Sequence, residues 1–118
     1  MQYTRLYTDE AGETHFDDVE VETSDEGRAG YFTAPKIPVS AMVFRRNNTT
    51  ETVDWHPAPR KQFILIISGG TEVTVSDGET RRFEPGSICL VEDLTGKGHV
   101  TKPINDAAGE RWSLFIEA

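Results

Sequence analysis

The chain of 118 residues suits one domain with a single hydrophobic core, and its net charge is −8, from 12 basic and 20 acidic residues. That charge excludes the basic footprint that nucleic acids and anionic membranes require, so we expect a partner of neither class. No apolar run approaches the ~18 residues of a membrane-spanning helix, and the N-terminus lacks the apolar segment of a signal peptide. Together with the single cysteine, Cys89, these features favour a cytoplasmic protein without an internal disulfide.

Residues 1–38 predict N-terminal strands and an acidic loop, because two short segments of alternating apolar and polar side chains flank a turn at residues 9–12. Acidic residues are concentrated between positions 9 and 26, where they indicate a solvated surface. His15 lies within this acidic stretch, and we expect it to be an ordinary surface residue.

The most apolar run of the chain, residues 63–67, follows the sequence HPAP at residues 56–59 and ends at Ser-Gly-Gly. Five apolar residues, mostly β-branched or aromatic, between proline and glycine predict a buried strand with both faces covered. His56 and Gln62 therefore lie at the mouth of the expected core strand, which is where small β-barrels commonly hold ligands and metals.

The rest of the chain consists of short strand-like segments with turn sequences between them, and no long segment repeats apolar residues at helical spacing. Asp77-Gly78 is a strong signal for a two-residue hairpin turn. About ten short strands are expected, at residues 3–8, 15–21, 31–33, 39–45, 50–55, 63–67, 71–76, 80–83, 87–91, 99–104 and 111–117, with a turn at residues 105–109. Short strands at this spacing predict an all-β sandwich or barrel.

The central stretch resembles the first motif of the cupin family, in which two histidines, a glutamate and a glycine follow one another at a characteristic spacing. His56 and Gly69 match the first histidine and the glycine, whereas Ala58 stands in place of the second histidine and Gln62 in place of the glutamate. The glycine that opens the family's motif would fall at position 50, which is Thr50 here, so the match is partial.

The family's second motif starts at a glycine and ends at a histidine, and Gly86 and His99 occupy these places, with about two extra residues in the loop between them. The resemblance covers residues 40–116. It implies that residues 1–118 form a single domain, a cupin-type β-barrel or double-stranded β-helix of the jelly-roll class.

Cupins hold a divalent metal with three histidines and a glutamate, so the resemblance implies a site at His56, Gln62 and His99 for Mn, Fe, Ni or Zn. Strand alternation predicts two inward faces, comprising His56, Ala58, Gln62, Ile64 and Ile66 on one and His99 and Thr101 on the other. A neutral glutamine does not offset the charge of a dication, so we expect weaker affinity than in a four-ligand site. The alternative is a metal-free pocket in which His56 and His99 bond a ligand or each other.

Four further residues are candidates for the pocket wall. Arg45 and Arg46 end an apolar strand, and the one that faces inward would clamp a carboxylate of a small ligand; the alternative is a surface ion pair. Met42 and Trp55 are candidates for pocket lining, against the alternative that they fill the core.

Three residues in and beside the second motif complete the set. Cys89 lies in the middle of an apolar strand and is expected to be buried and inert. In the loop at residues 92–98, we expect Asp93 to bond backbone amides of the turn, with a role as general base as the alternative. Lys97 is expected to lie in solvent.

These features predict a small cupin enzyme that acts on a small organic molecule in the barrel pocket, as an isomerase, cyclase, lyase or oxygenase. His56 and His99 are the expected catalytic residues, with or without a divalent metal, because imidazole exchanges protons near neutral pH. A cupin that binds a small ligand without turnover is the alternative, favoured by the replacements at Ala58 and Gln62. The resemblance also implies a homodimer, with residues 3–8 as the candidate contact.

Overall fold

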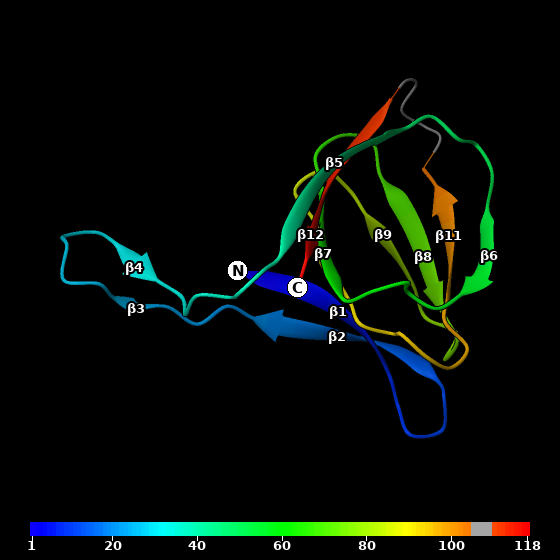
Figure 1. Ribbon diagram of the computed structural model, residues 1–118, viewed down its shortest axis with the longest axis horizontal. Coiled ribbons are helices and arrows are strands. Elements are labelled where there is room, and N and C mark those ends of the chain that lie inside the picture. Colours follow the sequence, from blue (N-terminus) through cyan, green and yellow to red (C-terminus); the bar gives the residue numbers. More distant parts are fainter. Residues whose placement is uncertain (105–109) are drawn as a thin grey trace.

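The computed structural model describes residues 1–104 and 110–118, so the turn predicted at residues 105–109 lies outside the described residues. The described residues contain twelve β-strands and no helix, which confirms the predicted all-β fold (Figure 1). Accordingly, that part of the chain has no helix with the length and hydrophobicity needed to cross a membrane.

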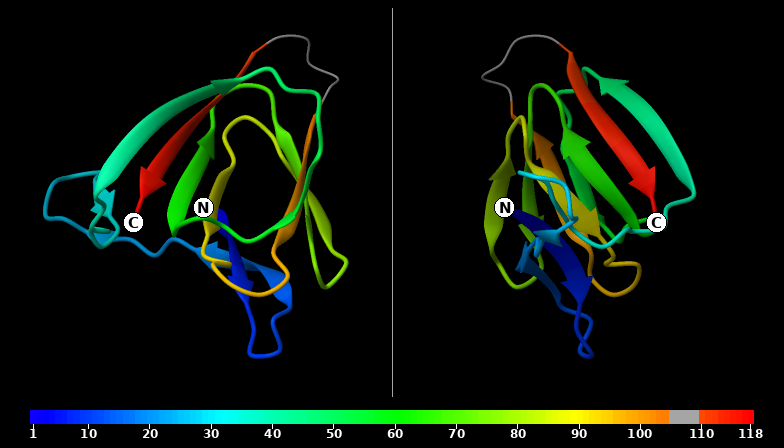
Figure 2. Two further views of the ribbon diagram at one scale, coloured as in Figure 1. Left: turned by 45° about the vertical axis from the view of Figure 1, so that its right-hand side comes forward. Right: turned by 90° about the vertical axis from the view of Figure 1, so that its left-hand side faces the viewer.

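Ten of these strands form two sheets that face each other, as in a jelly-roll-type domain (Figures 1 and 2). The larger sheet has the order β2 (Thr14–Glu20), β1 (Gln2–Thr8), β10 (Ile88–Val91), β7 (Gln62–Ile66), β12 (Arg111–Glu117) and β5 (Ala41–Asn47). The smaller sheet has the order β6 (Val53–His56), β11 (His99–Pro103), β8 (Thr71–Val75) and β9 (Thr80–Phe83). Neighbouring strands in both sheets run antiparallel except β1 and β10, which are parallel.

The two remaining strands form a separate hairpin. β3 (Ser24–Asp25) and β4 (Phe32–Thr33) pair only with each other in a two-stranded sheet. This hairpin projects from the body of the molecule between β2 and β5 (Figure 1).

The predicted core strand is β7, which lies between β10 and β12 in the larger sheet. Its even-numbered side chains face the other sheet, and Gln62 and Ile66 at its two ends are buried. Its odd-numbered face is only half-buried, with Phe63 packing edge-on to Tyr3 at 5.6 Å between ring centroids. The prediction that both faces are covered is therefore wrong for the outer face, because within the described part of the chain no second layer of strands packs over Phe63.

The loop at residues 92–98 packs against the turn between β1 and β2. Gly96 has a positive φ of 80°, and a Cβ there would overlap the carbonyl oxygen of Gly12. The backbone N–H of Lys97 donates to that same carbonyl at 3.0 Å, and the Lys97 ammonium pairs with Glu13. Lys97 lies in solvent as predicted, with its side chain 61% exposed, and it also pairs with Glu13.

Candidate functional site

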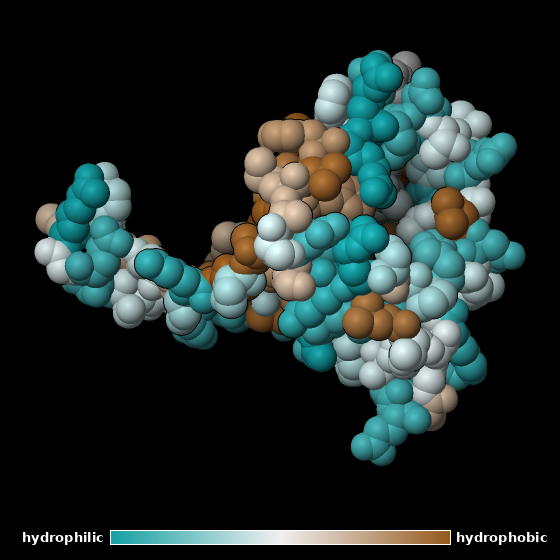
Figure 3. Space-filling view, in the orientation of Figure 1, coloured by the Kyte–Doolittle hydropathy of each residue, from teal (hydrophilic) through white to brown (hydrophobic). Residues whose placement is uncertain are grey.

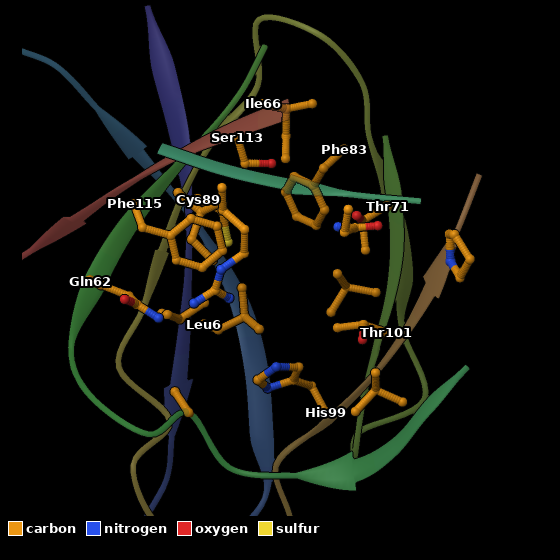
Figure 4. Close-up of a pocket in the computed structure, with 18 of the residues that line it drawn as sticks. Leu6, Gln62, Ile66, Thr71, Phe83, Cys89, His99, Thr101, Ser113 and Phe115 are labelled. Atoms are coloured by element: carbon orange, nitrogen blue, oxygen red, sulfur yellow. The ribbon is translucent and has the colours of Figure 1, made fainter. Parts of the chain in front are cut away.

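A cavity of about 410 Å³ lies between the two sheets, within the usual size range of small-molecule sites (Figure 4). Its wall combines aliphatic and aromatic side chains with two histidines, three arginines and several neutral polar groups. The lining residues are Leu6, Arg45, Asn47, Thr49, Glu51, Val53, His56, Ala58, Pro59, Arg60, Gln62, Ile64, Ile66, Thr71, Val73, Phe83, Cys89, Val91, His99, Thr101, Pro103, Arg111, Ser113 and Phe115.

The predicted inward faces agree with this lining. All five even-numbered residues from the central stretch, and both residues predicted from β11, belong to the wall: His56, Ala58, Gln62, Ile64, Ile66, His99 and Thr101. The turn at Pro57 and Pro59 therefore preserves the phase of alternation between β6 and β7. This agreement places the residues in one cavity, and it does not test their chemistry.

His99 is buried and projects into the cavity from the start of β11 (Figure 4). Its Nδ1 lies 2.5 Å from Oδ2 of Asp93, whose side chain is fully buried. No protein partner for the other carboxylate oxygen, Oδ1, is found among the described residues. The prediction that Asp93 bonds backbone amides is wrong. The loop turns this carboxylate inward, where it faces the imidazole of His99, the first residue of β11.

The bond to Asp93 determines which nitrogen of His99 carries the proton. A carboxylate accepts hydrogen bonds, so Nδ1–H of His99 donates to Asp93 and the lone pair is on Nε2. An imidazole held in this tautomer, inside a cavity, is the arrangement of a general base backed by a carboxylate.

His56 faces His99 across neighbouring strands. The two residues are paired in the register of β6 and β11, and their ring centroids lie 4.5 Å apart. The Nδ1–H of His56 donates to the carbonyl oxygen of Asp54 at 2.7 Å, which leaves the lone pair of His56 on Nε2 as well. Gly98 permits this approach, since it has a positive φ of 74° and a Cβ there would overlap the backbone of His56.

The predicted metal ligands fit a divalent metal only in part. His56, Gln62 and His99 share the cavity, but among residues 1–104 and 110–118 no group of three His, Cys, Asp or Glu side chains is placed to hold an ion. The carboxylate of Asp93 bonds His99 instead of pointing at a shared centre. Two imidazoles and a neutral amide supply no anionic ligand to offset a dication, so the donor set does not match the metal site that the cupin resemblance implies.

Of the two predicted arginines, Arg45 is the one that lines the cavity. Its guanidinium lies over the ring of Phe115, 4.1 Å from the centroid. Arg46 points the other way and pairs with Glu110 at 3.0 Å on the surface. Arg46 thus makes the predicted surface ion pair, and the clamping of a ligand carboxylate by Arg45 stays a prediction.

Met42 and Trp55 are not part of the cavity wall, and both side chains are exposed, by 59% and 50%. Met42 has the opposite phase to Arg45 on β5, so it faces outward. The pairing of β6 with β11 contains an irregularity: Val53 and His56, three residues apart, both face β11 residues that are two apart. Trp55 directly precedes the inward-facing His56, so ordinary strand alternation turns it outward. The bulge instead brings Val53 to the same wall as His56, and no sequence signal marked it.

Arg111 is a cavity residue that sequence reasoning missed. Its side chain is 6% exposed and lines the cavity together with Ser113 and Phe115. The apolar residues of this strand, among them Trp112, are the alternate set, and that pattern predicts the opposite face as the inner one. The larger sheet leaves its outer face half-covered, which is why the apolar set faces outward here.

Cys89 lines the cavity but offers no nucleophile. Burial raises the pKa of its thiol, and the nearby Asp93 raises it further. The side chain therefore stays protonated and contributes to the wall as a small apolar group, as the sequence predicts.

His15 lies outside the cavity and is not an unattached surface residue. Its Nε2 lies 2.7 Å from Asp9 and its Nδ1 2.7 Å from Asp77, so it connects the β1–β2 turn to the β8–β9 turn. The hydrogen bonds that His15 donates to the carboxylates of Asp9 and, second, Asp77 raise the pKa of His15 above its ordinary value. The acidic stretch around this histidine thus has a structural role that its composition did not indicate.

No protein-family model matches the chain, and a search of curated proteins gives no significant match. Among solved structures, it is similar to conserved protein SPY1581 of unknown function from Streptococcus pyogenes, with 18% identity and a TM-score of 0.48 over 72% of this chain and 68% of that one. Protein NMB1881 from Neisseria meningitidis has 15% identity and a TM-score of 0.47 over 83% and 81%. A candidate ethanolamine utilization protein Q from Salmonella typhimurium has 11% identity and a TM-score of 0.37 over 99% and 94%. At these scores, none of the three supports a conclusion about function.

Proposed function

We propose that this protein is a small enzyme of the cupin type that moves a proton on a small organic molecule bound in the cavity. The observation that carries the proposal is the bond between Asp93 and His99, both buried, at the wall of a cavity of ligand size. Isomerase, cyclase and lyase reactions all contain such a proton transfer. Oxygenase chemistry is the least supported of the predicted reaction types, since it depends on a metal that the donor set does not match.

In this proposal His99 acts as the general base. Its Nε2 takes a proton from the substrate, and the imidazolium that forms is stabilised by the carboxylate of Asp93 at Nδ1. The same nitrogen then returns the proton to a different atom of the substrate, so that no net proton is consumed in an isomerisation. His56, with its ring 4.5 Å away, is positioned to exchange a second proton with the same substrate.

The cavity wall supports this chemistry by limiting water. Aliphatic and aromatic side chains, including Leu6, Val73 and Phe83, are buried around the histidines. A partly dry wall strengthens the electrostatic stabilisation of an imidazolium by its carboxylate. A divalent metal at His56, Gln62 and His99 stays a prediction from the cupin resemblance, and elemental analysis of protein purified without chelator tests it.

The experiment that tests the proposed function is proton exchange in D₂O, followed by ¹H NMR. Pyruvate, 2-oxoglutarate and dihydroxyacetone are incubated with the protein, with His99→Gln and with the matched control His15→Gln. We expect at least one probe to lose its C–H signal faster with the parent and with His15→Gln, and at the uncatalysed rate with His99→Gln. Equal rates with the parent and His99→Gln would contradict the proposal.

A non-catalytic ligand-binding cupin is the second candidate. It is favoured by Ala58 and Gln62, which replace two metal ligands of the family's motif. Binding of a probe without exchange at any of its protons, with the probe recovered unchanged, supports this candidate over the enzyme. Its cavity, wall residues and cytoplasmic location would be the same as those predicted for the enzyme, so only turnover separates the two.

A further inference from the structure

The charge of the cavity wall is opposite to that of the whole protein. The chain has 20 acidic and 12 basic residues, yet the described wall contains three arginines, Arg45, Arg60 and Arg111, and one acidic residue, Glu51. Arg60 is paired with Glu117 at 3.5 Å, whereas Glu51 and Arg45 are both exposed and Arg111 is buried. The excess positive charge of the wall therefore rests on Arg45 and Arg111.

Arg111 is a buried cation with neutral partners only. Its guanidinium donates to Oδ1 of Asn47 at 2.8 Å and to the carbonyl oxygen of Thr49. Within residues 1–104 and 110–118, no carboxylate lies at ion-pair distance from either Arg111 or Arg45. A guanidinium has five N–H donors, and a buried charge without a counter-charge is costly, so the arrangement favours an anion from outside the chain.

Arg45 and Arg111 come from neighbouring strands, β5 and β12, and both line the cavity. Arg45 is opposite Ser113 in the register of β5 and β12, and Arg111 lies two residues before Ser113 on the same face. Ser113 lies across the cavity from His99 (Figure 4). Gly69 leaves room for the stem of Arg111, because a Cβ there would overlap the Cγ of that arginine.

We infer that the ligand of this cavity is a small organic oxyanion, a carboxylate or a phosphate ester. Its anionic group bonds Arg111, Arg45 adds a second positive charge to the same wall, and the ligand's reactive atom reaches His99. Only the contact with His99 rests on the proposed function; the contact of the anion with the arginines does not. Arginine suits this role because its planar donors match the oxygens of a carboxylate or phosphate in pairs.

The test is isothermal titration calorimetry with succinate, inorganic phosphate and the uncharged succinamide. We expect succinate or phosphate to bind and succinamide not to bind. The anion that binds more tightly shows whether the ligand is a carboxylate or a phosphate ester. Arg45→Gln and Arg111→Gln should each weaken that binding about tenfold or more, while the neighbouring but outward-facing Arg46→Gln should leave it unchanged. If Arg111→Gln does not fold, Arg45→Gln decides the question alone.

Equal binding of succinate and succinamide, or no binding of either anion, would overturn the inference. So would an Arg46→Gln variant as impaired as Arg45→Gln. His99→Gln separates this inference from the proposed function: we expect it to bind the anion while it fails to exchange protons. Anion binding without exchange by the parent refutes the enzyme and leaves the oxyanion site intact.

A second observation concerns the segment between β2 and β5, residues 21–40, which projects from the body (Figures 1 and 2). It includes β3 and β4, which are paired only with each other, and it exposes four large apolar side chains to solvent. These are Tyr31, Phe32, Ile37 and Val39. An extended segment that buries no apolar side chains of its own lacks the packing that would offset the entropy cost of ordering it.

The strand that follows this segment, β5, is also uncovered. It is an edge strand of the larger sheet, and Met42, Phe44 and the neighbouring Trp112 are exposed on its outer face. Figure 3 shows apolar residues gathered on this part of the surface. The projecting segment and the outer face of β5 together form a larger apolar surface than isolated side chains would.

The excess surface has the size of an interface. The accessible area is 7455 Å², against about 6400 Å² for a compact monomer of 13.2 kDa. The radius of gyration is 15.4 Å, against about 13.5 Å for a compact domain of this length. The excess, about 1000 Å², is close to the ~800 Å² that each partner buries in a stable dimer.

The cupin resemblance implies a homodimer, and we propose that its contact is this surface, with the projecting segment of each copy packed on the outer face of β5 of the other. Because both copies contribute the same two surfaces, the contact is two-fold symmetric and forms a closed dimer. The sequence predicts a dimer contact through residues 3–8. This segment belongs to β1, which has no free edge for pairing with a second copy, because it is hydrogen-bonded to β2 on one side and to β10 on the other.

Light scattering after size-exclusion chromatography tests this proposal at several protein concentrations. We expect a dimer for the parent, a monomer for Phe44→Glu and for Phe32→Glu, and a dimer for the control Leu94→Glu, whose side chain is 47% exposed outside this surface. A parent that is monomeric at 100 µM, a value on the order of the weakest useful affinities, would overturn it. So would a dimer that survives both phenylalanine variants.

Discussion

Two histidines of this protein bond carboxylates, and the difference between them separates a chemically available group from a structural one. His99 is buried at the cavity wall and uses one nitrogen, Nδ1, to bond Asp93. His15 lies outside the cavity and uses both nitrogens, one for Asp9 and one for Asp77. A histidine with a single carboxylate partner keeps a nitrogen for a ligand, whereas one with two is a clamp between turns.

The largest effect is expected on the rate of proton exchange. It should follow when the carboxylate partner of His99 is replaced by an amide, and not when that of His15 is. In Asp93→Asn the new amide can donate to Nδ1, which moves the proton of His99 to Nε2 and removes the base. We expect proton exchange to fall by about 10²–10⁴-fold. The measurement is the D₂O exchange rate, with Asp77→Asn as the matched control at His15. Similar losses in both variants would show that the two histidines do not differ as proposed.

A smaller effect is expected on stability when the approach of the two cavity histidines is disturbed. Gly98→Ala places a Cβ against the backbone of His56 at a φ of 74°, where side chains are strained. We expect a loss of about 1–3 kcal/mol in the free energy of unfolding, measured by urea denaturation. Gly78→Ala is the control: its φ is also positive, but nothing lies within 4 Å of the added Cβ. Equal losses of unfolding free energy in the two variants would mean that backbone strain alone causes the effect, and that the contact with His56 does not contribute.

The clamp at His15 predicts a dependence of stability on pH. Its pKa is raised in the folded protein, so its contribution is complete below the unfolded value of 6.5 and is lost as the pH rises through the folded value. The pKa of Asp9 and of Asp77 is lowered, so their contributions are lost as the pH falls below 3.8. We expect Tm to decline from pH 6 to pH 9 by more in the parent than in His15→Gln. Parallel curves for the two proteins over that range would refute the clamp.

The smallest effect is expected at the ion pair that joins the two regions. Lys97, in the loop before His99, pairs with Glu13, close to His15 in sequence, and its side chain is 61% exposed. Exposed pairs contribute about 0–1 kcal/mol, so Lys97→Ala should change the urea midpoint slightly and leave the exchange rate unchanged. A loss of exchange in this variant would mean that the loop position depends on the pair.

Local pattern was enough to predict the strands and part of the cavity wall. Alternation along each strand depends only on neighbouring residues, which is why His56, Gln62 and Ile64 were placed on one face correctly. The partner of His99 could not be predicted in the same way, because the direction of the Asp93 side chain depends on how the loop packs against the β1–β2 turn. The oligomeric state, the metal and the cytoplasmic location stay predictions.

By itself, the sequence determined an all-β chain with its turns and most of its inward-facing residues, because turn chemistry and two-residue periodicity act over a few residues. Only the tertiary structure decided which face of β12 lines the cavity and that Val53 shares the cavity wall with His56. The first depends on a sheet whose outer face is half-covered, so the apolar side of β12 faces outward and Arg111 faces the cavity. The second depends on a bulge between β6 and β11, which is a property of two paired strands.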